Sequence, residues 1–170
     1  MDTQPQYKER QLEADEAREV SVFAKDGRKT AKVGYFTNDS AKIVSAVDTH
    51  VNSLQRAIHA GSLTLNEQSR TYLSLQLGCL WGQQLIKQFG WEWVCVIDGD
   101  SELYAVVSKD RALMMLPTYF VNECLQDPNV DCTSILSFNM IAAQKFSETP
   151  SGSYLNILDI VVRIVPRHLV

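Results

Sequence analysis

The residues best suited to chemistry form an acidic run, Asp98-Gly99-Asp100-Ser101-Glu102. Carboxylates at the first, third and fifth positions are how a calcium-binding loop begins. The rest of that pattern is missing, because the sixth position is not glycine and the twelfth is Lys109 instead of a bidentate glutamate. Glycine and aspartate are also typical of tight turns. We therefore expect a solvated hairpin turn and no metal site, with Asp98, Asp100 and Glu102 able to steer a basic partner protein.

Three tryptophans, Trp81, Trp91 and Trp93, are the second candidate. Aromatic rings beside a carboxylate such as Glu92 can line a pocket for a sugar, a base or a cation. Strand alternation, however, places Trp91 and Trp93 on one face and Glu92 on the other. The two rings then suit the covering of a central helix, so we favour core packing and keep a ligand pocket as the alternative.

Covalent catalysis needs a nucleophile with a base in hydrogen-bond reach and a group that orients the base. The sequence contains none of the motifs that mark such sites, and no glycine-rich phosphate loop. We predict no catalytic residues, no cofactor, and cysteines that are free buried thiols. The cysteines are Cys79, Cys95, Cys124 and Cys132, and the histidines are His50, His59 and His168.

Composition limits the classes of partner. The chain has 170 residues, 45% of them hydrophobic, and a net charge of −4. Its longest basic cluster, residues 25–32, is too small for a nucleic-acid surface, so no nucleic-acid partner is expected. A polar N-terminus unlike a signal peptide and the lack of a long apolar run lead us to expect a cytoplasmic protein with no membrane partner.

The N-terminal region is charged. Residues 1–19 are expected to form a charged helix or to be mobile, and no structure is assigned to residues 1–6. Further on, Asp26-Gly27 lies between two β-prone runs, residues 20–25 and 28–36. An Asp-Gly pair in that setting predicts a hairpin with a type I′ turn.

Helical periodicity begins at Ser40, which we expect to cap a helix that ends before Gly61. Thr64 and Glu67 then form a capping-box pattern for a long helix that stops at Gly90. This helix is apolar on most sides, so it should lie at the centre of the fold. Within it, Gly78 and Gly82 each lower helix propensity, which predicts close approach of another helix or of the tryptophan strands.

Strands are expected at residues 91–98 and 103–108, paired antiparallel around Gly99-Asp100. A helix should span residues 117–126 and end before Pro128, and a further one should span 132–146. The tail, residues 154–170, fits a strand or a helix. Together these elements predict a single α+β domain over residues 1–170, with a small antiparallel sheet around a central hairpin, a long helix packed on it, and flanking helices.

Three segments, LGCLWGQQLIKQFGWEW (77–93), VVSKDRALMMLP (106–117) and SFNMI (137–141), resemble a group of small uncharacterised bacterial α+β domains over about residues 64–145. That group implies no catalytic residues. Comparable small acidic α+β proteins act in bacteria as immunity or inhibitor partners of secreted toxins.

The leading functional hypothesis is therefore a non-enzymatic protein-binding module of the immunity or inhibitor type, which sequesters a toxin or effector protein. A small-ligand-binding protein or enzyme that uses the tryptophan region is one alternative. The other is a homo-oligomeric structural protein in which residues 157–165 pair across a two-fold axis.

Overall fold

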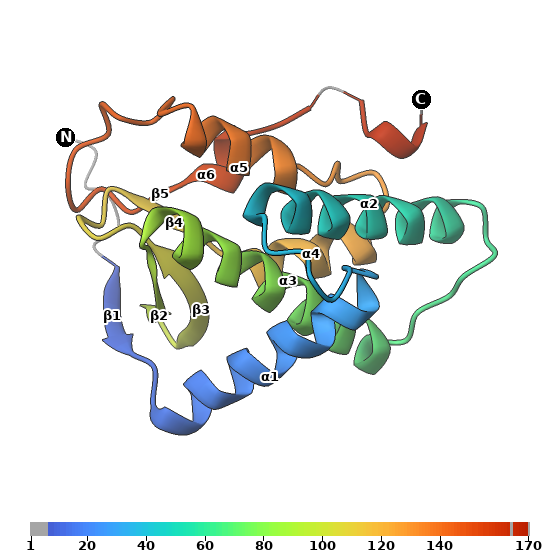
Figure 1. Ribbon diagram of the computed structural model, residues 1–170, viewed down its shortest axis with the longest axis horizontal. Helices are drawn as coiled ribbons and strands as arrows, with labels where there is room; N and C mark the ends of the chain where they lie inside the picture. Colours follow the sequence, from blue (N-terminus) through green and yellow to red (C-terminus); the bar gives the residue numbers. More distant parts are fainter. Residues whose placement is uncertain (1–6, 164, 170) are drawn as a thin grey trace.

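Helices flank a small mixed sheet in this α+β protein (Figure 1). The structure is a computed structural model and describes residues 7–163 and 165–169, so residues 1–6 of the predicted N-terminal segment lie outside it. The helices are α1 (Ala14–Thr30), α2 (Ser40–His59), α3 (Glu67–Phe89), α4 (Pro117–Gln126), α5 (Ser134–Ala142), α6 (Ile157–Ile160) and the 3-10 helix η1 (Arg167–Leu169). The strands are β1 (Lys8–Gln11), β2 (Glu92–Asp98), β3 (Ser101–Val107), β4 (Leu113–Met115) and β5 (Leu155–Asn156). The α+β class is as predicted.

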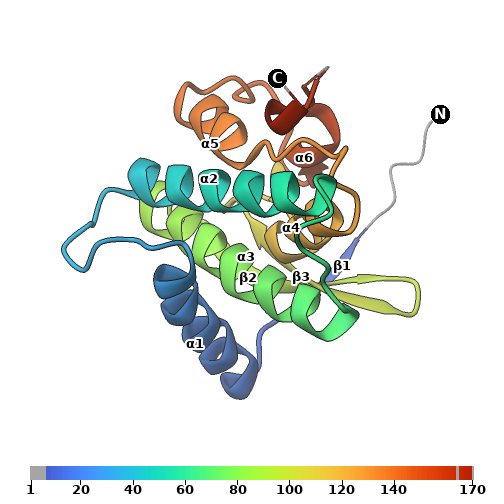
Figure 2. The ribbon, with the colours of Figure 1, turned by 90° about the vertical axis from the view of Figure 1, so that its right-hand side faces the viewer.

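Helix α3 is the centre of the molecule. It contacts α1, α2 and α4 along its length and lies against the sheet through β2 and β3 (Figures 1 and 2). Its middle, from Gln76 to Gly82, is buried at every position. This all-round burial confirms the central position that its apolar composition predicts.

Two glycines of α3 explain how its neighbours come so close. A Cβ atom on Gly78 would lie 2.4 Å from the Thr118 Cα of α4, and one on Gly82 would lie 2.2 Å from the Trp93 ring of β2. The expected approach of a second helix and of the tryptophan strands is therefore confirmed, one partner at each glycine.

The predicted hairpin at residues 20–36 is wrong, because α1 continues through Asp26 and Gly27 to Thr30. Gly27 is present for a different reason from turn formation. A Cβ atom there would lie 2.2 Å from the backbone oxygen of Gln76, so glycine allows α1 to cross α3 at very short range. Contact with α3 outweighs the local turn preference of Asp-Gly.

The sheet has the order β1-β2-β3-β4-β5. β2 and β3 form the expected antiparallel hairpin, with Trp93 opposite Val106 and Asp98 opposite Ser101. β1 adds an antiparallel edge that the sequence did not predict, and the short β5 pairs parallel with β4, so the sheet is mixed instead of purely antiparallel. The ambiguous tail supplies both strand β5 and helices α6 and η1.

Helix boundaries agree with the sequence to within a few residues. Gly90 ends α3 with a left-handed φ of 69°, and α4 spans the predicted residues. The N-terminal caps are shifted, because the side chains of Asp39 and Asn66 accept the backbone N–H groups of Lys42 and Ser69. The predicted caps, Ser40 and Thr64, do not cap these helices. Helix α5 is shorter than predicted.

A second small core lies on the sheet face that points away from α3. It consists of apolar side chains of β2, β3 and β4, and a charged group lies over it. The Arg111 guanidinium donates to Glu9 of β1 and to Glu92 of β2, and the Tyr154 hydroxyl donates to Glu9 at 2.9 Å. Arg111 therefore joins the edge strand to its neighbour. The core residues are Val94, Val96, Ala105, Val107 and Met114.

Candidate functional site

All three tryptophans lie in the main hydrophobic core. Trp81 packs edge-on against Phe120, Trp91 lies next to Phe89, and Trp93 lies over Gly82. None of them lines any of four cavities in the described part of the chain. This placement agrees with the core-packing interpretation, and a ligand role for the tryptophans stays a prediction.

The acidic turn is partly neutralised. Asp98 and Asp100 are exposed at the hairpin tip, whereas Glu102 makes an ion pair with Arg10 of β1 at 2.7 Å. The same guanidinium binds Glu16 at 2.7 Å. Hydrogen bonding to Arg10 lowers the pKa of Glu102, and it lowers the pKa of Glu16 to about 2. Of the three predicted residues, Asp98 and Asp100 are the ones whose charge is uncompensated in the described part of the chain.

Sequence reasoning missed the feature that stands out most on the surface. Tyr35 and Phe36, in the connection between α1 and α2, are each 89% exposed. Their rings pack edge-on with centroids 5.0 Å apart. We call this pair the aromatic knob. Two adjacent aromatic side chains exposed to this degree form a contiguous apolar surface, which is the kind of feature that marks an interaction site.

Local hydrogen bonds fix the position of the knob. The Thr37 N–H donates to the Gly34 carbonyl at 3.0 Å, which makes Tyr35 and Phe36 the central residues of a turn. The Arg28 guanidinium of α1 donates to the carbonyls of Gly34 and Thr37, so the helix end supports both sides of that turn. The knob is therefore held in place by α1.

Basic residues are frequent in the sequence on either side of the knob. Residues 25–42 contain five basic and two acidic side chains, in a chain whose net charge is −4. The described structure shows Lys25, Lys29, Lys32 and Lys42 as exposed. The segment that carries the two aromatic rings is thus opposite in net charge to the protein as a whole.

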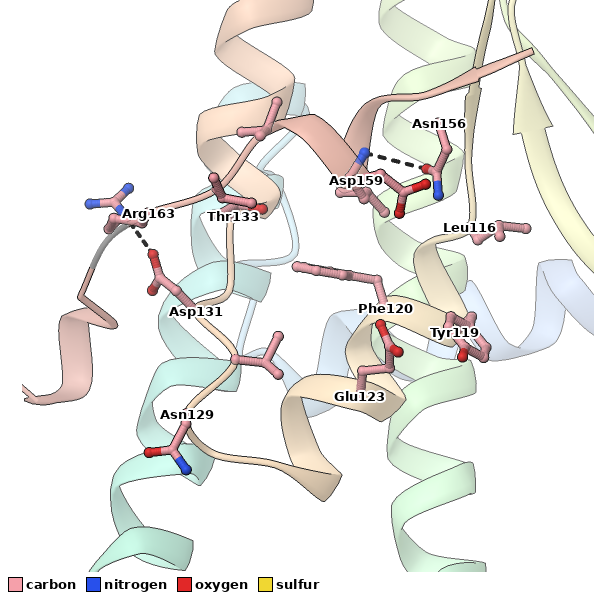
Figure 3. Close-up of a pocket in the computed structure, with 14 residues that line it drawn as sticks. Leu116, Tyr119, Phe120, Glu123, Asn129, Asp131, Thr133, Asn156, Asp159 and Arg163 are labelled. Carbon is pink, nitrogen blue, oxygen red and sulfur yellow. Dashed lines mark hydrogen bonds and ion pairs between the residues drawn. The ribbon is translucent and has the colours of Figure 1, made fainter. Parts of the chain in front are cut away.

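A cavity of about 350 Å³ lies at a different place, between α4, the connection to α5, and the segment from β5 to residue 163 (Figure 3). Phe120 and Leu158 supply apolar walls. Two carboxylates, Glu123 of α4 and Asp159 of α6, line it together with Tyr119, whose pKa is raised first by the charge of Glu123. A volume of this size suits a small molecule.

The opposite side of the cavity holds an ion pair and an unusual hydroxyl. Asp131 pairs with Arg163 at 2.7 Å, which neutralises one acid (Figure 3). Thr133 precedes α5 as its N-cap, yet its side chain makes no capping bond. Its Oγ1 is buried and has no hydrogen-bond partner in the described structure.

Asp48 of α2 explains why the Thr133 hydroxyl is free of the helix. Its carboxylate accepts the Ile135 N–H at 3.3 Å and the Ser134 hydroxyl at 3.1 Å, so it caps α5 from a neighbouring helix. The Arg167 guanidinium donates to the same carboxylate at 2.8 Å. Burial raises the pKa of Asp48, and these donors oppose that rise.

Among the described side-chain hydrogen bonds, none joins a histidine to a cysteine, serine or threonine, and the hydroxyls and thiols that bond to carboxylates do so without a histidine. His59 and His168 lie next to each other with ring centroids 6.0 Å apart, and the four cysteines are buried. In the described residues, no three histidine, cysteine or acidic side chains are grouped so that they could hold a metal ion. The helices described include none that is long and apolar enough to cross a membrane.

Comparison with known proteins finds a match for part of the chain. Residues 50–132 match a family model. The family is described as "Domain of unknown function (DUF3806)". The match runs from the second half of α2 through α3, the β2–β3 hairpin and α4 to Cys132 in the α4–α5 connection. The predicted resemblance to an uncharacterised domain is confirmed at that level. No curated protein and no solved structure matches the chain.

The matched region includes the α4 wall of the cavity, with Tyr119 and Glu123, and omits the aromatic knob and α6. The knob and the Asp159 side of the cavity are therefore features of this chain outside the stretch that resembles the family.

Proposed function

We propose that the protein is a non-enzymatic binding module that docks one partner protein through the aromatic knob. The main observation in support is that Tyr35 and Phe36 are each 89% exposed on a turn held by Arg28. Aromatic side chains dominate the binding free energy of protein interfaces when they enter a pocket on the partner. A knob already held in its exposed position loses little conformational entropy on binding.

The charge around the knob defines the partner's chemistry. Exposed lysines close in sequence to the two rings suit an apolar pocket with an acidic rim. Because Lys29 lies 3.5 Å from Asp26 and Asp39 also lies close in sequence, the surface has mixed charge, which fits a protein rim better than a uniformly anionic lipid surface. An immunity or inhibitor protein that sequesters a toxin or effector is one form of this function, and a cytoplasmic location is part of the same proposal.

The acidic hairpin tip provides a second contact in this proposal. Asp98 and Asp100 are exposed and would steer a basic patch on a partner. A homo-oligomer formed through residues 157–165 has less support, because Ile157, Leu158 and Val161 are buried in the core, and the exposed hydrophobic residues described in that range are Ile160, Val162 and Val165.

The test is an affinity capture from the native host with the full chain as bait, followed by mass identification and a binding titration with the purified partner. We expect one stoichiometric protein, and at least a hundredfold weaker binding by Tyr35→Ala/Phe36→Ala, since two central aromatic anchors contribute about 2 kcal/mol each. Tyr72→Ala, at another exposed aromatic, is the matched control and should bind as the wild type does.

Charge variants separate steering from anchoring. Lys29→Glu/Lys42→Glu should lower the association rate and its salt dependence with a smaller effect on dissociation. Binding of the wild type to anionic phosphatidylserine vesicles without any protein partner would overturn the proposal in favour of a lipid surface. Unchanged affinity in the double aromatic variant would also refute it.

A further inference from the structure

The cavity bounded by α4, the α4–α5 connection and α6 has the composition of a recognition site for a small organic cation. Its carboxylates, Glu123 and Asp159, take part in no ion pair among the described residues, whereas Asp131 is occupied by Arg163. Both side chains are exposed at the mouth of the cavity, and acids without cationic partners leave net negative charge there. That charge attracts a cation.

The aromatic and apolar walls favour an organic cation over a bare metal ion. Tyr119 lines the cavity together with both carboxylates, and Phe120 extends across it (Figure 3). Aromatic faces next to carboxylates are the usual surroundings of bound ammonium groups. The described residues contain no group of three ligands for a metal ion.

Thr133 is the independent observation that points to a ligand. The residue is 1% exposed, lines the cavity, and has a hydroxyl with no hydrogen-bond partner in the described structure. A buried hydroxyl without a partner is costly, and natural structures rarely contain one unless water or a ligand completes it. Because Asp48 already caps α5, the hydroxyl is not needed by the helix and is directed into the cavity, on the side opposite Glu123 (Figure 3).

We propose that this cavity binds a small organic cation, whose ammonium or guanidinium group lies between Glu123 and Asp159, whose apolar part packs on Phe120, and whose polar end reaches Thr133. The volume of about 350 Å³ limits the ligand to roughly a dozen non-hydrogen atoms. This site lies on elements other than the aromatic knob and is independent of the proposed protein-binding function.

Binding is measured by NMR titration of the full chain with agmatine, which has a guanidinium and an amine, and with 1-butanol as the neutral control. We expect saturable shifts at residues of α4 and α6 with agmatine and none with 1-butanol. Glu123→Gln/Asp159→Asn should weaken binding at least tenfold, and Glu19→Gln, an exposed acid on α1, should leave it unchanged.

Thr133→Val tests the hydroxyl separately, because valine keeps the shape of the side chain. The variant should bind agmatine several-fold more weakly while melting at the same temperature as the wild type or higher, since no described partner is lost. A lysine-containing tetrapeptide added in place of agmatine distinguishes a free amine from a partner's side chain, and saturable binding of either supports the site. Equal response to agmatine and 1-butanol, or an unchanged affinity in the double carboxylate variant, would refute the proposal.

Discussion

Replacing Gly27 with alanine tests the packing of α1 on α3. The added Cβ atom would lie 2.2 Å from the Gln76 oxygen, whereas ordinary contact begins at 3.4 Å, so the two helices must separate by about 1 Å. The opposing atoms are backbone and cannot rotate away. Overpacking of this kind costs about 3 kcal/mol, at the upper end of its usual range.

Alanine also has a favourable effect that must be subtracted. In the interior of a helix it is more stable than glycine by about 1 kcal/mol. The net expectation is a loss of about 2 kcal/mol in the free energy of unfolding, or a fall of about 4–8 °C in melting temperature for a chain of this size. Urea titration monitored by circular dichroism measures the first quantity, and a thermal scan measures the second.

Two control variants make the result specific. Ala17→Gly, at an exposed position of the same helix, should lose only the propensity difference of about 1 kcal/mol. Asp26→Ala should be close to neutral, because in a helix its ion pair with Lys29 is a surface pair, whereas in a hairpin turn the same change would destabilise. A Gly27→Ala variant as stable as the wild type, or more stable, would show that α1 and α3 are not this close.

Three other measurements test separate parts of the structure. Arg111→Lys should lose the forked contact with Glu9 and Glu92. The free energy of opening of β1 should fall by roughly 1 kcal/mol, so amide hydrogen exchange in β1 should be several-fold faster, with little change in α3. The pKa of Glu16 is lowered to about 2 in the folded state from 4.5, so its stabilising effect is present above pH 4.5 and is lost as the pH falls to about 2. Glu16→Gln should therefore be less stable than the wild type at pH 7, with a difference that vanishes near pH 2 in urea titrations. Burial raises the pKa of Cys79 to about 12, and all four thiols are buried, so the native protein should react with a disulfide reagent far more slowly than the denatured protein.

The parts of the fold that the sequence predicted are those determined by local chemistry. Helix α4 begins with Pro117 and ends before Pro128, and proline restricts the backbone in the same way in any context. The end of α3 at Gly90 and the β2–β3 turn likewise depend on residues that are neighbours in the sequence. Such boundaries can be inferred without knowledge of the tertiary structure.

The missed parts depend on contacts distant in sequence. β1 consists of Lys, Glu, Arg and Gln, which have no strand pattern, and it is held by pairing with β2 and by ion pairs from Arg10 and Glu9. The helical state of Asp26-Gly27 depends on the backbone of α3. Local propensity predicts neither the pairing of β1 with β2 nor the contact of α1 with α3.

The candidate sites were missed for the same physical reason. The cavity combines three segments of the chain, and the unbonded state of the Thr133 hydroxyl follows from the capping of α5 by Asp48, 85 residues earlier. Tyr35 and Phe36 were assigned to a strand, where aromatic residues are common. Gly34 before them and Asn38-Asp39 after them favour turns, and this composition was the available indication of an exposed loop.

The knob and the cavity should act independently. The knob belongs to the α1–α2 connection and the cavity to α4, α6 and the segment between α4 and α5, and Figure 2 shows these elements on opposite sides of the molecule. No described hydrogen bond or ion pair joins them, and effects at sites without shared partners are additive to within about 0.5 kcal/mol. Partner affinity measured with and without agmatine should therefore agree within about twofold, and Tyr35→Ala/Phe36→Ala should leave agmatine binding unchanged. A larger coupling would mean that α3, which contacts both α1 and α4, changes position between the two bound states.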